Sequence, residues 1–350
     1  MALIKFNGIG IKSISATVPK KRVKTIEQTD LLNKDQLLKF IEATGVQERR
    51  IADKDTCGSD LSYDAAINLF NKTGINPNDI DALIFLSQTP DYRVPQTSLI
   101  LQDKLKLPKT TLAFDISMTC SGYIYGLFVA YSIANIEGMN NVLLMIGETL
   151  SKITSAKDKS SGLLLGDAGS ATLISKNDKY GESFFSLNTD GSNYKSVFIP
   201  GGGFRNMSSL ETLTDKVYED GSVRNDEQVN MDGMEVFSFA VSELPKDVKR
   251  LLAFSGIEIT SIDKFAFHQA NKFMIDLIAK KLKIDTQKLL YSIDKYGNTS
   301  GVSIPLTLVD QNHLINNNDL ILFNAIGAGF SWGSILLRLI DYQILSISEL

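Results

Sequence analysis

Cysteine and histidine are scarce in this chain, so each of these residues is a candidate for chemistry. The 350 residues contain two cysteines, Cys57 and Cys120, and two histidines, His268 and His313. Cys57 and His313 lie in polar sequence that is typical of loops and helix ends. Cys120 and His268 each stand between an apolar, strand-like run and a helical pattern. A nucleophile and a hydrogen-bonding partner could therefore meet at these two positions.

Cys120 directly precedes the helix that the sequence predicts over residues 121–136. Free backbone N–H groups and the macrodipole at a helix N-terminus stabilise a thiolate and lower the pKa of the thiol. The thiolate is the nucleophilic form of cysteine. Free cysteine is also often a small, buried apolar residue. Position alone leaves both a nucleophilic and a structural Cys120 open.

His268 and Asn298 are polar residues at similar junctions. The helix that follows His268 has an apolar stripe that predicts core packing, and His268 itself could be a capping residue. Asn298 lies in a Gly-Asn-Thr-Ser segment, which is also ordinary turn and N-cap sequence. A functional Asn298 would need its side-chain amide to point into a cavity.

Two glycine-rich segments lack the spacing of nucleotide-binding loops. They are Gly166-Asp-Ala-Gly169 and Gly327-Ala-Gly-Phe-Ser-Trp-Gly333. The second has G-x-G-x-x-x-G spacing and is followed by a predicted strand over residues 335–340, where a dinucleotide site needs a helix. Glycine turns carry little steric bulk, so this segment could instead aim backbone N–H groups at an oxyanion.

The elements that position these residues alternate between strands and helices. We predict strands over residues 81–86, 111–116, 141–146 and 320–323, with helices over residues 96–105 and 121–136. This alternation indicates an α/β fold with mainly parallel sheets covered by helices. The helix over residues 121–136 is apolar nearly all round, which indicates a helix buried in the middle of a layered structure.

The sequence also contains an internal repeat. Gly74-Ile75-x4-Ile80-Asp81-x3-Phe85 recurs 182 positions later as Gly256-Ile257-x4-Ile262-Asp263-x3-Phe267. A second match, from Asn140 to Asn317, has an offset of 177. We therefore predict two halves, residues 1–180 and 181–350, with Cys120 and Asn298 in equivalent turns. Such turns can converge on one site, because ligands bind beyond the carboxyl ends of strands in α/β sheets.

Composition and charge exclude several classes of protein. The 36 basic and 40 acidic residues give a formal charge of −4, whereas a nucleic-acid-binding protein needs a net basic field. Two cysteines cannot make a disulfide-rich scaffold, and the Cys and His residues have no zinc-ligand spacing. No signal-peptide pattern or membrane-spanning run is present. We expect a cytoplasmic protein with no metal site, nucleic-acid partner or membrane segment.

Seven segments, in order along nearly the whole chain, resemble β-ketoacyl-acyl-carrier-protein synthase III of the thiolase fold. They are Thr44-Gly-Val-Gln-Glu-Arg-Arg50, Phe114-Asp-Ile-Ser-Met-Thr-Cys-Ser-Gly122, Gly166-Asp-Ala-Gly169, Asn230-Met-Asp-Gly-Met-Glu-Val-Phe237, His268-Gln-Ala-Asn271, Gly297-Asn-Thr-Ser300 and Gly327-Ala-Gly-Phe-Ser-Trp-Gly333. The resemblance implies a five-layered αβαβα fold built by internal duplication, usually as a homodimer. It adds no resident cofactor, since the substrates are thioesters of coenzyme A or phosphopantetheine.

The resemblance also implies roles for the three polar residues. Cys120 would attack an acyl thioester and carry the acyl group. His268 and Asn298 would bind the thioester carbonyl of a malonyl-acyl-carrier protein and stabilise the enolate that forms as carbon dioxide leaves. The enolate would then attack the acyl-Cys120 carbonyl in a decarboxylative Claisen condensation, in fatty acid or related biosynthesis.

Further residues acquire roles in the same way. The oxyanion hole would comprise the Cys120 N–H and an N–H of the Gly327–Gly329 loop, with Ala328 as the expected donor. Phe237 would line the pocket, and Val94 resembles the dimer segment that reaches the partner's acyl pocket. Lys272, Lys280 and Lys281 could form a basic patch for an acidic carrier protein, or simply a solvated lysine face.

The sequence departs from the family pattern near the substrate entrance. Lys39 and Ala43 stand where well-studied members carry a Trp and an Arg that bind coenzyme A, which puts acyl-CoA primers in doubt. Met118 and Thr119 replace residues that are usually small, so the pocket shape is expected to differ. Phe273 stands where an Arg often meets the carrier protein.

Three alternatives remain beside this reading. The first is a condensing or acyl-transfer enzyme of a specialised-metabolite pathway that uses carrier-protein-bound primers. The second is a catalytically silent thiolase-fold partner, which would be expected to lack Cys120, His268 or Asn298. The third is a papain-type protease, whose Cys-to-His spacing fits but whose sequence around the cysteine does not.

Overall fold

Two stacked β-sheets form the framework of the protein. The structure, a computed structural model, describes residues 2–350. The first sheet has the order β17-β2-β8-β7-β5-β6, with β18 also paired to β2, and the second has the order β1-β9-β16-β15-β14. The strands of the first sheet are β2 (Ile9–Val18), β5 (Ala82–Leu86), β6 (Leu112–Ile116), β7 (Asn141–Glu148), β8 (Ala168–Lys176), β17 (Gln343–Ile344) and β18 (Ser348–Glu349). Those of the second are β1 (Ala2–Asn7), β9 (Glu182–Thr189), β14 (Lys264–Phe267), β15 (Leu320–Gly327) and β16 (Ser331–Arg338).

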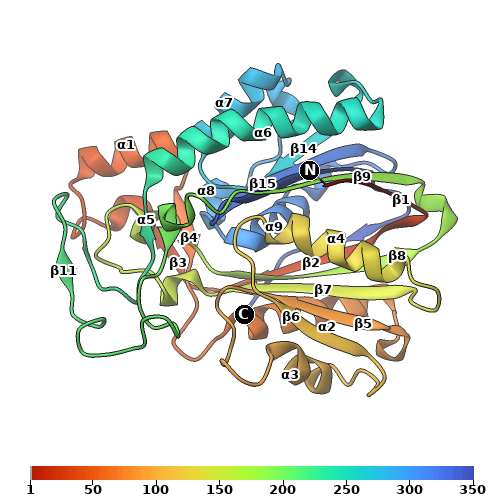
Figure 1. The fold of residues 1–350 in the computed structure, drawn as a ribbon, viewed down its shortest axis with the longest axis horizontal. Coiled ribbons are helices and arrows are strands. Elements are labelled where there is room, and N and C mark those ends of the chain that lie inside the picture. The colour runs from red at the N-terminus through yellow and green to blue at the C-terminus, as the bar shows by residue number, and fades with distance from the viewer. Residues whose placement is uncertain (1) are drawn as a thin grey trace.

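Helices complete a five-layered αβαβα arrangement (Figure 1). α2 (Gly58–Thr73) and α3 (Thr97–Lys104) cover the outer face of the first sheet, and α6 (Gly233–Ser255) and α7 (Lys272–Leu282) cover that of the second. α4 (Gly122–Ala134) and α9 (Ser303–Asp310) lie between the two sheets. The predicted thiolase-like α/β fold is thus confirmed, and so is the buried helix that follows Cys120.

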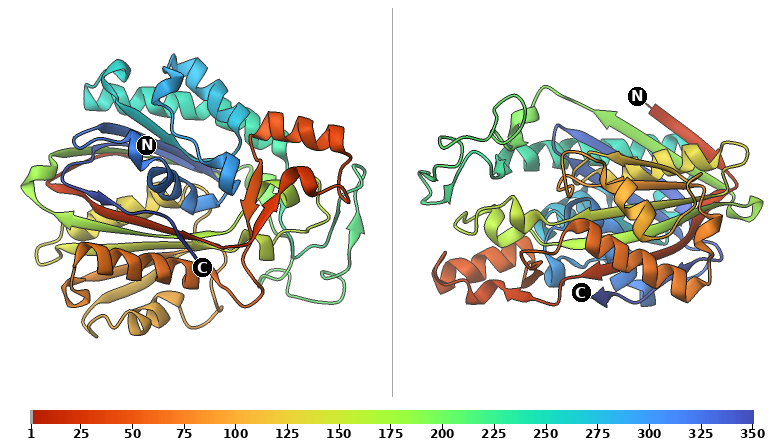
Figure 2. Two further views of the ribbon diagram at one scale, coloured as in Figure 1. Left: turned by 180° about the vertical axis from the view of Figure 1, so that it is seen from behind. Right: turned by 90° about the horizontal axis from the view of Figure 1, so that it is seen from below.

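Smaller elements gather at one end of the layers, where Figure 1 and Figure 2 show α1 and β11 projecting from the body. They are β3 (Arg22–Lys24), α1 (Lys34–Thr44), β4 (Glu48–Arg50), α5 (Ser161–Leu164), β10 (Val197–Phe198), β11 (Lys216–Val217), β12 (Val223–Arg224), β13 (Asn230–Met231) and α8 (Ile293–Tyr296).

The internal repeat is visible in the strand order. β5, β7, β8 and β2 follow one another in the first sheet as β14, β15, β16 and β9 do in the second. β14 begins 182 residues after β5, as predicted, but strand pairing matches Val142 of β7 to Ile321 of β15. The second offset is therefore 179, and the predicted value of 177 is wrong by two residues. An even error leaves the same side chains facing the core, because strands have a period of two.

The two termini cross between the sheets. β1 pairs with β9 in the second sheet, while β17 and β18 pair with β2 in the first. The division at residues 180 and 181 falls in the turn between β8 and β9 and stays a prediction.

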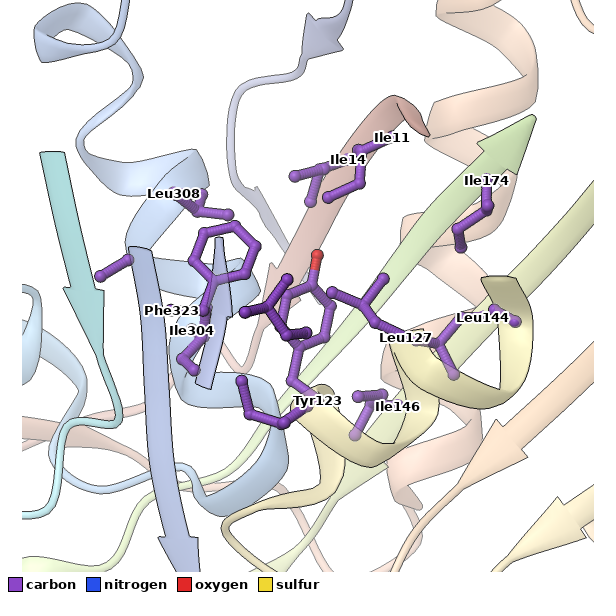
Figure 3. Packing of buried hydrophobic residues seen from close by; sticks show 14 of the residues in the cluster. Ile11, Ile14, Tyr123, Leu127, Leu144, Ile146, Ile174, Ile304, Leu308 and Phe323 are labelled. Atoms are coloured by element: carbon purple, nitrogen blue, oxygen red, sulfur yellow. The ribbon is translucent and has the colours of Figure 1, made fainter. Parts of the chain in front are cut away.

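The largest core cluster lies around α4. Figure 3 shows Tyr123 and Leu127 of this helix pointing toward Ile146 of one sheet and Phe323 of the other. Burying each such side chain contributes about 1.5–3 kcal/mol. A Cβ on Gly122, at the start of α4, would lie 2.5 Å from a Leu86 methyl group. The glycine lets α4 approach β5 closely, and this approach fixes the turn that carries Cys120.

Candidate active site

One cavity brings Cys120, His268 and Asn298 together. Its volume is about 140 Å³, and all three residues line it. Cys120 lies in the turn between β6 and α4, His268 follows β14, and Asn298 lies between α8 and α9. The predicted convergence of equivalent turns from the two halves is confirmed, because Cys120 and Asn298 each precede the central helix of their half.

Most of the remaining cavity wall is apolar. Its apolar members are Leu150, Leu164, Leu165, Val197, Val229, Met231, Val236, Met274, Ile326 and Phe330. They come from both halves of the chain and from β10 and β13 of the smaller region. An apolar wall around three convergent polar groups is suited to an acyl chain attached to a polar thioester.

Cys120 differs from expectation in its ionisation. The side chain reaches the cavity but is densely surrounded by protein, and burial raises the pKa of the Cys120 thiol to about 11. The predicted lowering of this pKa is wrong, because Cys120 stands one residue before the N-cap Ser121 and desolvation outweighs the effect of the helix end. The Ser300 hydroxyl donates to Cys120 Sγ over 3.5 Å and opposes this rise.

His268 is a neutral imidazole. Burial lowers its pKa to about 4, and its Nδ1 lies 2.7 Å from Ser303 Oγ. Ser303 Oγ also accepts a hydrogen bond from the backbone N–H of Gln269 at 3.4 Å. The Ser303 hydroxyl proton is then directed to Nδ1, so we assign the ring proton to Nε2. His268 can therefore donate a hydrogen bond without carrying a charge.

Asn298 has its amide orientation set by its neighbours. Its Oδ1 accepts a hydrogen bond from the backbone N–H of Ser300 at 2.9 Å, which leaves the Nδ2 donors for the cavity. The Asn298 backbone pairs in both directions with residues 164 and 166, which begin the Gly166-Asp-Ala-Gly169 segment. This glycine segment therefore braces the Asn298 turn.

The glycine loop after β15 also reaches the cavity. Gly327 and Ala328 line it, whereas Gly329 lies just outside the lining. A Cβ on Gly327 would lie 2.6 Å from Thr119 Oγ1 and 2.8 Å from the Ser121 backbone nitrogen, so glycine is required there. The Ala328 N–H, the predicted oxyanion donor, is hydrogen-bonded to Thr119 Oγ1 at 2.9 Å. An oxyanion must compete with this hydroxyl oxygen for the Ala328 N–H.

Five other predicted residues lie outside the cavity lining. Phe237 stacks on Phe273 with ring centroids 5.7 Å apart, near the start of α6 and α7. Val94 is 83% exposed. The three lysines lie on α7, where Lys272 pairs with Asp276, Lys281 donates to a backbone carbonyl, and Lys280 is exposed.

The two remaining candidates by residue type are away from this cavity. Cys57 caps the start of α2, and His313 is exposed in a short 3-10 helix. Within residues 2–350, no cluster of three or more His, Cys, Asp and Glu side chains could hold a metal ion. No helix of the described chain is both long and apolar enough to cross a membrane.

The sequence reasoning missed Gln88 and Ser300, both of which line the cavity. Ser300 was present in a recognised segment but had no role, and its unusual positive φ of 51° cannot be read from residue type. Gln88 follows β5, and its position after a buried strand was the one available signal.

Comparisons with known proteins agree with this site. Residues 114–191 match the family model for 3-oxoacyl-[acyl-carrier-protein (ACP)] synthase III, and residues 252–339 match the model for its C-terminal part. A putative 3-oxoacyl-[acyl-carrier-protein] synthase 3 of Campylobacter jejuni is 34% identical over 96% of both chains. A β-ketoacyl-[acyl-carrier-protein] synthase III of Caldanaerobacter subterraneus is 36% identical over 84% of this chain and 87% of its own.

A solved structure extends the likeness to the fold. The 3-oxoacyl-(acyl-carrier protein) synthase of Burkholderia xenovorans is 33% identical, has a TM-score of 0.93, and is matched over 100% of this chain and 99% of its own. The chain therefore belongs to the β-ketoacyl-acyl-carrier-protein synthase III family.

Proposed function

We propose that the protein condenses an acyl primer with malonyl-acyl-carrier protein by decarboxylative Claisen chemistry, in fatty acid or related biosynthesis. The observation that carries this proposal is the convergence of Cys120, a neutral His268 and the Asn298 amide in one apolar-walled cavity. Membership in the family supports it.

The first half-reaction uses the thiol. Cys120 Sγ attacks the carbonyl of the acyl thioester, the bond to the leaving thiolate breaks, and the leaving thiolate takes up the proton. The tetrahedral intermediate carries a negative oxygen, which the N–H groups of Cys120 and Ala328 stabilise. Removing one donor from such an oxyanion hole slows a reaction by roughly 10²–10³.

The second half-reaction uses the two donors. The Nε2–H of His268 and an Nδ2–H of Asn298 donate to the malonyl thioester carbonyl. The bond to the carboxylate breaks, carbon dioxide leaves, and the electron pair forms an enolate at that carbonyl. The enolate carbon attacks the acyl-Cys120 carbonyl, and the Cys120 thiolate departs. A neutral imidazole is suited to this donation because its Nε2–H needs no prior protonation.

Single substitutions separate the two half-reactions. Cys120→Ser should abolish the acyl-enzyme that intact-protein mass spectrometry detects after incubation with an acyl donor. His268→Ala should leave this self-acylation largely intact and impair decarboxylation. Retained acylation in Cys120→Ser excludes Cys120 as the nucleophile, and equal loss of both steps in His268→Ala contradicts the division of roles.

The primer is proposed to arrive on a carrier protein, and the reaction needs no resident cofactor. Lys39 and Ala43 support this choice, because neither offers an aromatic or guanidinium surface for an adenine nucleotide. Lys280 at the exposed end of α7 adds positive charge for an acidic carrier. Acyl-carrier donors should therefore acylate Cys120 faster than the matching acyl-CoA, and a clear preference for acyl-CoA overturns this assignment.

We also propose a cytoplasmic homodimer. β6 is the edge strand of the first sheet, and it leaves Leu112 44% exposed. Val94, 83% exposed in the loop after β5, adds apolar surface. An exposed strand edge with apolar side chains favours pairing with a second copy. Leu112→Arg should shift the mass measured by light scattering from dimer to monomer, and an unchanged dimer refutes this interface.

A further inference from the structure

Glu148 is a buried carboxyl group beside the site that the proposed reaction does not use. It ends β7, its side chain is 0% exposed, and no salt bridge to it is present among residues 2–350. Three donors surround it: the backbone N–H and side-chain amide of Gln88, at 3.4 Å, and Thr89 Oγ1, at 3.2 Å. Burial raises the pKa of Glu148 to about 8. A carboxyl group kept at this cost needs a structural or functional reason.

Gln88 connects Glu148 to the nucleophile. The Gln88 amide nitrogen donates to Glu148 Oε1 and also to Ser300 Oγ, the second bond being 2.7 Å long. A flipped amide would place its carbonyl oxygen against the Glu148 carboxylate and would lose both bonds. The carboxylate thus fixes which end of the amide faces Ser300.

Ser300 completes the connection. Its Oγ accepts a hydrogen bond from Gln88, so its single hydroxyl proton is available for Cys120 Sγ, 3.5 Å away. The Ser300 backbone is held in place, since its N–H is bonded to Asn298 Oδ1 at 2.9 Å. The hydroxyl group is therefore oriented from both sides as a donor to sulfur.

We propose that Ser300 donates a hydrogen bond to the Cys120 thiolate, and that Gln88, oriented by Glu148, is the positioning residue that holds the Ser300 hydroxyl in this direction. The inference rests on the proposed function in taking Cys120 as the nucleophile. A hydrogen bond to the charged form favours that form, which opposes the burial that disfavours the thiolate. Serine and glutamine thus supply part of what the helix end does not.

The test measures the reactivity of the Cys120 thiol without any substrate. A Cys57→Ala background leaves one reactive cysteine, and intact-protein mass spectrometry follows its alkylation by iodoacetamide between pH 7 and pH 11. Ser300→Ala should lower the alkylation rate at pH 8 about tenfold, which corresponds to an upward shift of about one pH unit in the profile. Gln88→Met, which keeps the length of the side chain but has no amide, should have a smaller effect in the same direction.

The double variant distinguishes positioning from general damage. If Gln88 acts through Ser300, adding Gln88→Met to Ser300→Ala should cause no further shift in the profile. Ser87→Ala is the matched control, because Ser87 Oγ bonds to the Gly147 carbonyl beside this network and not to Ser300. It should leave the profile of the parent unchanged.

Three results overturn the proposal: an unchanged profile in Ser300→Ala, additive shifts in the double variant, or an equal shift in Ser87→Ala. Gln88 borders a cavity, so Gln88→Met keeps the test available if Ser300→Ala does not fold. Failure of the proposed function looks different, because a parent protein that alkylates as expected would then form no acyl-enzyme with any thioester donor.

Discussion

The buried, neutral His268 predicts a decarboxylation step that tolerates acid. Burial lowers the His268 pKa to about 4, whereas an ordinary histidine has a pKa near 6.5. At pH 5 about 90% of a group with the lower pKa is neutral, compared with about 3% of an ordinary histidine. If the neutral form is the donor, the rate should change less than about twofold between pH 8 and pH 5. An ordinary histidine in the same role predicts a fall of about thirtyfold.

The assay isolates this step from acyl transfer. A Cys120→Ala variant cannot form the acyl-enzyme, so conversion of malonyl-carrier protein to acetyl-carrier protein reports decarboxylation alone. Mass spectrometry of the carrier protein gives the rate and shows that the carrier stays intact at each pH. Cys120→Ala with His268→Ala provides the background rate. A rate that falls with an inflection near pH 6.5 would refute the reasoning, since it would show that His268 titrates as an exposed group.

The remaining predictions concern stability and the oxyanion hole. Because the native His268 pKa lies below the unfolded value, the unfolded chain gains the proton first, and the His268 contribution to stability is lost as pH falls from about 6.5 to 4. The urea-unfolding free energy should show an acid-dependent loss of up to about 3 kcal/mol that is absent in His268→Gln. Gly147→Ala places a Cβ 2.0 Å from a backbone oxygen of α2 and should cost at least about 3 kcal/mol or prevent folding, whereas Gly191→Ala, with open space around it, should be near neutral in thermal unfolding. Asp247→Ala leaves three buried donors without their carboxylate and should lower the unfolding free energy by about 3 kcal/mol or more. Thr119→Val frees the Ala328 N–H and should speed self-acylation by roughly fivefold, while a tenfold fall would show that the hydroxyl itself serves the oxyanion.

The fold follows from sequence features that are local and repeated. The apolar runs over residues 81–86, 111–116 and 141–146 form β5, β6 and β7 because continuous apolar strands are buried on both faces. The repeat indicated that the second half would copy this order. The exchange of terminal strands was not predicted, because β1 and β17 are ordinary apolar segments whose partners depend on the packing of the finished halves.

The three polar residues of the site could be found because each follows a strand or precedes a central helix. Ser300 and Gln88 could not, because serine and glutamine are common in turns and their partners are remote. Ser300 lies 180 residues from Cys120 along the chain, and Gln88 lies 212 residues from Ser300. Only the packing of one half against the other makes these residues neighbours.

The ionisation of Cys120 shows why such contacts matter. A helix end is visible in the sequence, and its effect on a thiolate has a known sign. Desolvation has the opposite sign and depends on everything that surrounds the sulfur, including residues from the second half of the chain. The local rule therefore fails here, and the thiol rests in its protonated form. The hydroxyl of Ser300 comes from that same second half, so the packing that disfavours the thiolate also delivers the donor that opposes this effect.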